Sequence, residues 1–511
     1  MSSSGEFLPT QQKMLQAAED AVHGIIASCG CGTGKTLVSL MLGDIWRAER
    51  PLLLVPGGLK EKTNTDIVAY QNAGFCFNPP KVMSYEEMSQ KRGPEKIASF
   101  APDVIICDEA HYLKSLKSAR TRRIGAYIEK NKIRCAFLSG SIMRNISDFA
   151  HLCYWALGDR SPLPHSPRRA EEWDVVLQGE ANEHQFANFC WQAELKKGES
   201  PKEAVHRRLA ACPDIILDAG QTIPTSLVFY KHPVVMPSRV RKILAEAFSG
   251  ESYIADILFR EGVSDSYDEI LRSQHIWDGD GVARIVAQAF CGFLYYWDWT
   301  SRPDEEWLSA RKNWAKVVRR VLGRNIPGVD TPSLVRDHIE KDEIPEYLYY
   351  LKKWEEQEHK EQPPTRGVWV SDHMINAVRV WLQIQASPAI IWVGFAEFGE
   401  KLSEVLGLPY YRGEIPTPPA HDCIMSIAAM GTGKNLQEWN NNLVAHPLSC
   451  PLRWEQMLAR THRTGQLSDE VSVTYFDYGP FASSLKRAQI EAKIIETTLN
   501  QRQRLLYGSY A

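Results

Sequence analysis

The chain has 511 residues and a mass of 57.9 kDa, several times the size of one small core, so we expect at least two domains. Hydrophobic residues make up 44% and charged residues 24%, and these fractions exclude a mainly disordered or fibrous chain. The net charge of −3 excludes a strong attraction of the whole molecule for nucleic acid, so such binding would need local basic patches.

Membrane and export signals are not expected. No stretch approaches the roughly 20 consecutive apolar residues that span a bilayer, and the first ten residues lack the basic and apolar regions of a secretory signal. Eleven cysteines without a paired framework indicate reduced thiols. We therefore expect a cytoplasmic protein with no membrane partner.

Short apolar runs bounded by Gly, Pro, Asn or Asp recur in two parts of the chain, and most are followed by a helix-like segment. The early runs are 24–27, 52–55, 104–107 and 135–138, and the late runs are 389–393, 423–427, 443–445 and 471–476. This alternation is typical of parallel sheets flanked by helices. The predicted fold class is α/β, with two parallel-sheet lobes.

The same pattern sets the expected domain boundaries. Residues 1–155 form the first lobe, 156–375 a mainly helical insert and linker, 376–485 the second lobe, and 486–511 a C-terminal helix. In the insert, the aromatic block 293–299 is expected to be core rather than a platform for stacked bases.

A glycine-rich segment follows the first apolar run and leads into an apolar helix. In this position, glycines let backbone N–H groups turn toward phosphates, a lysine reaches the β- and γ-phosphates, and a threonine holds Mg²⁺. Cys29 stands where the GxxxxGK[ST] pattern has its first glycine. The segment predicts an ATP-binding loop made of Gly30, Gly32, Thr33, Gly34, Lys35 and Thr36.

Two acidic residues, Asp108 and Glu109, end the apolar run 104–107. Phosphoryl transfer needs charge neutralisation and an aligned nucleophile. We therefore expect Asp108 to hold Mg²⁺ together with Thr36, and Glu109 to orient and deprotonate the attacking water. Taken alone, such a pair is often a solvated turn.

The order and spacing of these motifs resemble the superfamily-two helicases, and in detail the Swi/Snf-type DNA translocase branch. The resemblance covers about the first 155 residues and residues 385–480. A compact chain of this kind resembles stand-alone bacterial or bacteriophage translocases more than eukaryotic remodellers, which implies a bacterial or phage-infected cytoplasm. The segments that carry it are 8–11 (LPTQ, with the adenine-reading Gln11), 108–114 (DEAHYLK), 139–141 (SGS), 431–436 (GTGKNL) and 456–466 (QMLARTHRTGQ).

The resemblance implies two RecA-like lobes, Mg²⁺ and ATP as cofactors, and duplex DNA as the partner. It also implies that His111, Ser139, Ser141, Gly431 and Gly433 couple hydrolysis to motion. Residues 431–434 read GTGK, but Asn435 follows where a phosphate loop has Ser or Thr. We interpret this segment as a tight backbone turn.

In the sixth motif, the spacing i, i+4 and i+7 predicts that Gln456, Arg460 and Arg463 lie on one face of a helix. An arginine delivered from the second lobe would stabilise transition-state charge only when the lobes close. The alternative is a basic helix face paired with local acids.

Two basic patches stand out. The first contains Lys114, Lys117, Arg120, Arg122 and Arg123. In the second, no acid falls between 311 and 324, and one helical face carries Lys312, Lys316, Arg319 and Arg320. This face is expected to contact nucleic-acid phosphates. The alternative is that it is only solvated.

The expected function is an ATP-dependent motor that tracks on double-stranded DNA. Two alternatives stay open: a strand-separating DNA or RNA helicase, and an assembly protein whose nucleotide-dependent closure holds a protein partner through residues 156–375. Stimulation of ATP hydrolysis by DNA separates the motor from the assembly protein.

Overall fold

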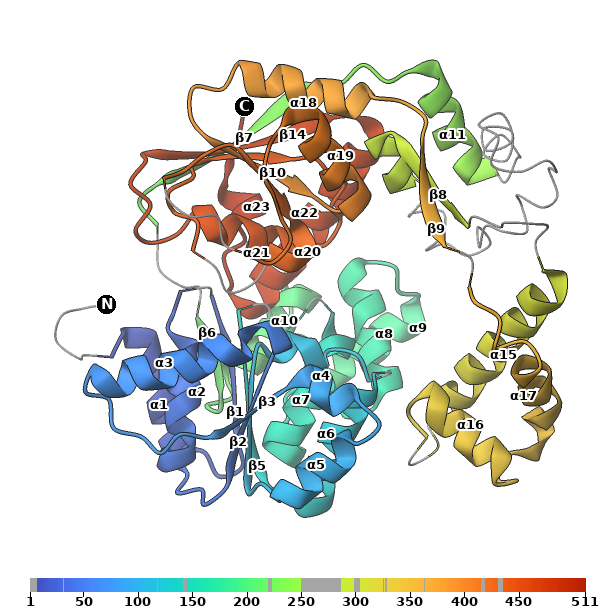
Figure 1. The fold of residues 1–511 in the computed structure, drawn as a ribbon. Helices are drawn as coiled ribbons and strands as arrows, with labels where there is room; N and C mark the ends of the chain where they lie inside the picture. Colours follow the sequence, from blue (N-terminus) through green and yellow to red (C-terminus); the bar gives the residue numbers. More distant parts are fainter. Residues whose placement is uncertain are drawn as a thin grey trace. The chain divides into compact units, whose positions relative to one another are not determined.

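The structure is a computed structural model that describes the chain apart from residues 1–6, 31, 117, 141, 142, 144, 219–222, 250–285, 298–303, 325, 327, 328, 363, 415–418 and 431–434. It divides into two compact units (Figure 1). The first unit comprises Met1–Thr222, Arg319–His338 and Glu491–Gln503, and the second comprises Ile223–Val318, Ile339–Ile490 and Arg504–Ala511.

The first unit is built on a six-stranded, wholly parallel sheet with strand order β3-β2-β4-β5-β1-β6. Its central strands are apolar and buried, as strands covered on both faces must be. The strands are β1 (Ile25–Cys29), β2 (Pro51–Val55), β3 (Lys81–Ser84), β4 (Val104–Asp108), β5 (Arg134–Ser139) and β6 (Ile215–Asp218).

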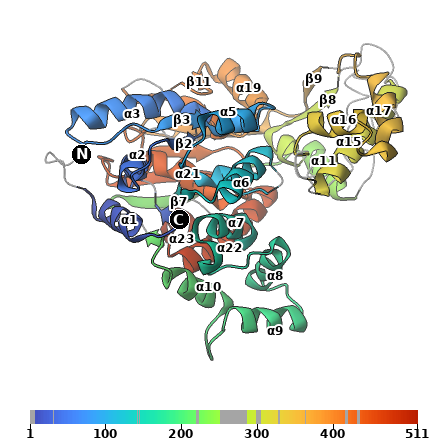
Figure 2. The ribbon, with the colours of Figure 1, turned by 90° about the horizontal axis from the view of Figure 1, so that it is seen from below.

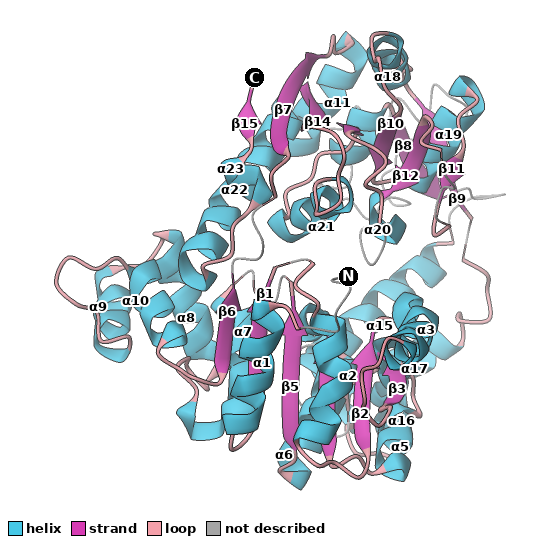
Figure 3. Ribbon diagram, turned by 90° about the vertical axis from the view of Figure 1, so that its left-hand side faces the viewer, coloured by secondary structure: helices cyan, strands magenta, loops and turns pink. Residues whose placement is uncertain are grey.

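Helices cover both faces of this sheet (Figure 3). On one face lie α1 (Pro9–Asp20), α2 (Lys35–Ile45) and α3 (Lys60–Asn72), which share a core with alternate residues of β1, β2, β4 and β5. The other helices of this part of the chain are α4 (Tyr85–Ser89), α5 (Gly93–Phe100), α6 (Ala119–Asn131) and α7 (Ile146–Leu157). Three further helices lie side by side in Figures 1 and 2: α8 (Pro167–Gln178), α9 (Glu183–Gln192) and α10 (Pro201–Ala210).

The second unit holds a seven-stranded parallel sheet with order β11-β12-β10-β13-β14-β7-β15. The strands are β7 (Ser226–Pro233), β10 (Ala389–Val393), β11 (Tyr410–Tyr411), β12 (Cys423–Ser426), β13 (Asn441–Val444), β14 (Glu470–Asp477) and β15 (Ser509–Tyr510). A separate antiparallel pair joins β8 (Phe293–Trp297) to β9 (Thr365–Trp369).

The helices after β7 follow in chain order. They are α11 (Ser238–Ser249), α15 (Glu305–Gly323), α16 (Pro332–Glu340), α17 (Leu348–Glu355), α18 (His373–Gln383), α19 (Ala396–Leu406), α20 (Ile427–Met430), α21 (Pro451–Thr461), α22 (Gly479–Leu499) and α23 (Arg504–Tyr507). Within the described residues, none of them is both long and apolar enough to cross a membrane.

The two parallel sheets confirm the predicted α/β class with two RecA-like lobes, and all eight predicted apolar runs form strands. The segment 156–375 also supplies β6 to the first sheet and β7 to the second, which the sequence analysis missed. Residues 486–511 are more than a helix, because α22 ends at Leu499 and β15 then pairs with β7. Phe293 is fully buried, so its part of the aromatic block is core, as expected; residues 298 and 299 lie outside the described residues.

Candidate active site

The glycine-rich loop of the first unit connects β1 to α2. Gly32 (φ 85°) and Gly34 (φ 76°) adopt left-handed backbone conformations that side chains with a Cβ rarely tolerate. Gly34 ends the loop, and Lys35 and Thr36 begin α2, whose N-terminus has unpaired N–H groups and positive potential. This strand–loop–helix geometry is the one that the glycine spacing predicted.

Lys35 is buried at the start of α2, and its ammonium lies inside the loop. Nζ donates hydrogen bonds to the main-chain carbonyls of Cys29 and Gly30, both at 2.8 Å. Thr33 Oγ1 donates to the Gly30 carbonyl at 2.9 Å. The only lysine of the loop is therefore held where phosphates would have to bind, and burial makes its charge count more than at the surface.

Asp108 is the last residue of β4 and is buried, whereas Glu109 is partly exposed. Burial raises the pKa of Asp108 to about 6; the neighbouring Glu109 carboxylate adds to the shift, and Lys35 opposes it. Tyr85, fully buried and stacked on Tyr112 at 5.4 Å, donates its hydroxyl to the Asp108 carbonyl at 2.8 Å. A carboxylate that is costly to keep charged is suited to binding a cation.

Glu109 has a left-handed backbone (φ 55°), which is uncommon for a residue with a side chain. Its Oε2 lies 3.2 Å from His111 Nδ1, and the same nitrogen lies 3.0 Å from Ser139 Oγ. Because Ser139 ends β5, the strand between β4 and β1, His111 connects the acid pair to the next strand. Ser141, grouped with them in the sequence analysis, lies outside the described residues.

The N-terminal helix α1 contacts the loop through the predicted Gln11. Its Nε2 donates to the Gly34 carbonyl at 3.1 Å, while its Oε1 accepts from the Leu8 N–H at 2.7 Å. A Cβ on Gly34 would lie 2.2 Å from Gln11 Nε2, so a larger residue there would displace this side chain as well as strain the left-handed backbone. Gln11 thus braces the glycine-rich loop.

Sequence reasoning missed Asp218, which ends β6 beside β1. Its Oδ2 accepts from Thr10 Oγ1 at 2.8 Å, and its carbonyl accepts from the Gly30 N–H at 3.3 Å. The short apolar run before it lies in the segment 156–375, which was expected to be mainly helical, so it was not counted as a strand. Its contact with the loop arises from pairing with a strand almost 190 residues earlier.

These residues fit Mg²⁺ and ATP. The carboxyl edge of a parallel sheet is where ligands of such sheets bind. Here this edge holds a turn with two left-handed glycines, a helix N-terminus, one buried lysine and one buried carboxylate. Among the described residues no cluster of three or more His, Cys, Asp or Glu side chains could hold a metal. Mg²⁺ usually keeps several waters and binds through one or two protein ligands plus phosphates, so Thr36 and Asp108 would share it with phosphate oxygens and water.

The sixth motif lies on α21 of the second unit. Arg460 is buried, and its Nε donates to the Gln456 carbonyl at 3.0 Å. The expectation that Arg463 shares their helical face is wrong, because α21 ends at Thr461 and His462 leaves helical geometry. Arg463 lies in the following turn, with its guanidinium hydrogen-bonded to the Asn435 side chain. Gly431 and Gly433 lie outside the described residues.

The first basic patch is largely used for internal contacts. Arg123 is buried and forms a bidentate pair with Asp330 at 2.8 and 2.9 Å. Arg122 donates to the Leu322 carbonyl at 3.1 Å, and Arg120 donates to the Tyr112 carbonyl at 2.9 Å. These arginines hold parts of the first unit together, so they are not a free cationic surface.

The second basic patch is exposed. On α15, Trp307, Val317 and Val321 are buried, and the opposite face carries four exposed cations: Lys312, Lys316, Arg319 and Arg320. Among the described residues none of these four makes an ion pair or a side-chain hydrogen bond. The face is thus available for an anionic partner.

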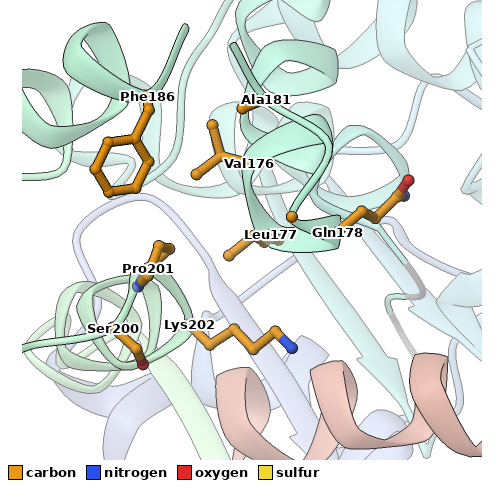
Figure 4. A pocket seen from close by; sticks show the side chains of 9 residues that line it. Val176, Leu177, Gln178, Ala181, Phe186, Ser200, Pro201 and Lys202 are labelled. Carbon is orange, nitrogen blue, oxygen red and sulfur yellow. The ribbon is translucent and has the colours of Figure 1, made fainter. Parts of the chain in front are cut away.

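A pocket of about 450 Å³ lies among α8, α9 and α10 of the first unit (Figure 4). Val176, Leu177 and Phe186 line it together with Ser200 and Lys202, and the Phe186 ring faces Pro201 across the opening. None of the predicted site residues lines it, so it is distinct from the phosphate loop.

No family model matches the chain, and no curated protein matches it.

Proposed function

We propose that the protein hydrolyses Mg²⁺–ATP and uses the energy to move along double-stranded DNA, as the resemblance to the Swi/Snf-type branch of superfamily-two helicases implies. The observation that carries the hydrolytic part is the single sheet edge that holds Lys35, Asp108, Glu109 and the His111–Ser139 contact. Bound Mg²⁺ would neutralise charge that develops on the phosphates.

Each residue of the proposed site has a separate role in hydrolysis. Backbone N–H groups of the loop and the Lys35 ammonium bind and orient the phosphates. Glu109 stands one residue beyond the buried Asp108, and its carboxylate would take the proton of the attacking water. The His111 ring lies within 3.2 Å of Glu109 and 3.0 Å of Ser139. A change in the protonation of the Glu109 carboxylate would therefore change the contact of His111 with the end of β5. Arg463 would supply the second unit's positive charge to the transition state.

DNA is supported as the partner by the resemblance and by the exposed cations of α15. Residues 312–320 span about 12 Å at 1.5 Å per residue, a length that can face successive phosphates of one strand. Contacts to phosphates carry no sequence information, so the motor would not depend on base sequence.

The proposed function is tested with a panel of duplex, single-stranded and forked DNA and RNA. Duplex DNA is expected to raise ATP turnover strongly, and the protein should displace a third strand from a triplex without unwinding a tailed duplex of similar length. Glu109→Gln, which keeps the side chain's shape but removes the base, is the control for contaminating ATPase. Unwinding without triplex displacement would favour the strand-separating helicase, and turnover indifferent to nucleic acid would favour the assembly protein.

The basic face of α15 gives a second prediction. Changing Lys312, Lys316, Arg319 and Arg320 to Glu should weaken duplex binding and flatten its salt dependence, because each lost phosphate contact removes counterion release. A matched control reverses four exposed cations elsewhere: Lys62, Lys130, Lys132 and Lys197. The measurement is the affinity for duplex DNA from about 50 to 200 mM salt. If the slope of affinity against salt is the same in the variant and the unaltered chain, the α15 face is only solvated.

A further inference from the structure

The turn that carries Arg463 is held by an unusual run of hydrogen bonds. Every main-chain carbonyl from position 460 to position 464 accepts one. Leu436 N–H donates to Arg460 at 3.1 Å, and the Gln466 side chain and N–H donate to Thr461 and Arg463 at 3.0 and 3.1 Å. The Gln437 side chain donates to Thr464 at 2.9 Å. Residues near the motif thus supply four of the five donors.

The fifth donor comes from the other end of the sequence. Arg504, the first residue of α23, donates to the His462 carbonyl from Nη2 at 3.0 Å and from Nε at 3.3 Å. Both residues belong to the second unit and both are buried. This contact lies at the C-terminus of α21, where the last carbonyls have no partner within the helix and a cation is favoured.

Arg504 is itself held in place by Glu455, on the second turn of α21. Glu455 accepts the Arg504 main-chain N–H at 3.0 Å and pairs with its guanidinium, and its side chain is 9% exposed against 7% for Arg504. The planar fork of arginine can meet the carboxylate and the carbonyl at once, which an ammonium cannot do. The guanidinium therefore spans the last two turns of the helix.

The His462 ring completes the cluster. Nδ1 accepts from Arg504 Nε at 3.3 Å, so in the neutral ring Nε2 carries the hydrogen and donates to the Thr225 carbonyl at 2.9 Å. Burial, together with the Arg504 charge, lowers the pKa of His462 to about 4, which keeps the ring neutral at neutral pH. His462 cannot rotate without breaking both contacts.

We infer that Arg504 is a positioning residue for Arg463: by holding the His462 carbonyl, it fixes where the chain leaves α21 and where the Arg463 side chain begins. The inference rests on the proposed function, in which Arg463 stabilises transition-state charge. A small displacement of such a group costs rate without changing how ATP is bound by the first unit.

The test uses Arg504→Lys in the full chain, because lysine keeps the charge opposite Glu455 and avoids leaving that buried carboxylate unpaired. The matched control is Leu505→Ala, which removes buried packing from the same helix but leaves every donor to the turn intact. Hydrogen exchange of residues 462–467 should be faster in Arg504→Lys and unchanged in Leu505→Ala. Equal exchange in Arg504→Lys and the unaltered chain would overturn the inference.

Kinetics test the link to Arg463. Arg504→Lys should lower kcat for DNA-stimulated hydrolysis by about 10-fold to 100-fold with KM for ATP unchanged. In an Arg463→Ala background it should lower kcat no further, because the effects of residues that act as a unit are not additive. Full additivity of the two losses would overturn it. If the unaltered chain hydrolyses no ATP, the proposed function fails, whereas the exchange result still decides whether Arg504 positions the turn.

Discussion

Replacing Lys35 with alanine is expected to lower ATP turnover by at least about a thousandfold, because the change removes the only side-chain cation of the phosphate loop from a buried position. The variant should also bind ATP more weakly, since in the proposed function the ammonium would contact the phosphates before and during transfer. Phosphate release and the affinity for a fluorescent ATP analogue measure the two effects separately.

Lys13→Ala is the matched control for this experiment. Lys13 lies near the same loop, with its Nζ 3.9 Å from Asp218, but 68% of its side chain is exposed. The control removes the same charge from the same side of the unit and should keep near-normal turnover. Near-normal hydrolysis by a folded Lys35→Ala protein would remove the assignment of this loop to ATP.

The Arg463→Ala change is expected to lower kcat by on the order of a thousandfold or more, the range found for arginine fingers. ATP affinity should hardly change, because the loop and Lys35 belong to the first unit. Arg460→Ala should have a smaller effect on kcat, since the Arg460 side chain is buried and bonded to its own helix.

Arg453 offers a matched control on α21, the helix that precedes Arg463, because it carries the same charge and is exposed. Arg453→Ala should hydrolyse ATP at nearly the normal rate. Intact DNA-stimulated hydrolysis by Arg463→Ala would show that the second unit does not supply this charge. A parallel loss of ATP affinity would instead place Arg463 among the binding residues.

Local spacing was enough to predict the chemical groups of the first unit. The glycines, Lys35 and Thr36 lie within one strand–loop–helix segment, and Asp108 and Glu109 lie at the end of one apolar strand. The backbone of such short segments follows directly from their residues, because left-handed turns need glycine and buried strands need continuous apolar runs. The two parallel sheets followed from the same periodicity.

Tertiary structure alone decided how distant residues support these groups. Asp218 reaches the phosphate loop because β6 pairs with β1, and Arg504 reaches the sixth motif because α23 docks on α21. Arg463 leaves the predicted helical face because His462, held by Thr225 and Arg504, ends the helix two residues before Arg463 is reached. Such contacts join positions tens to hundreds of residues apart, and no local pattern encodes them, since their free energy comes from packing and hydrogen bonds that exist only in the folded chain.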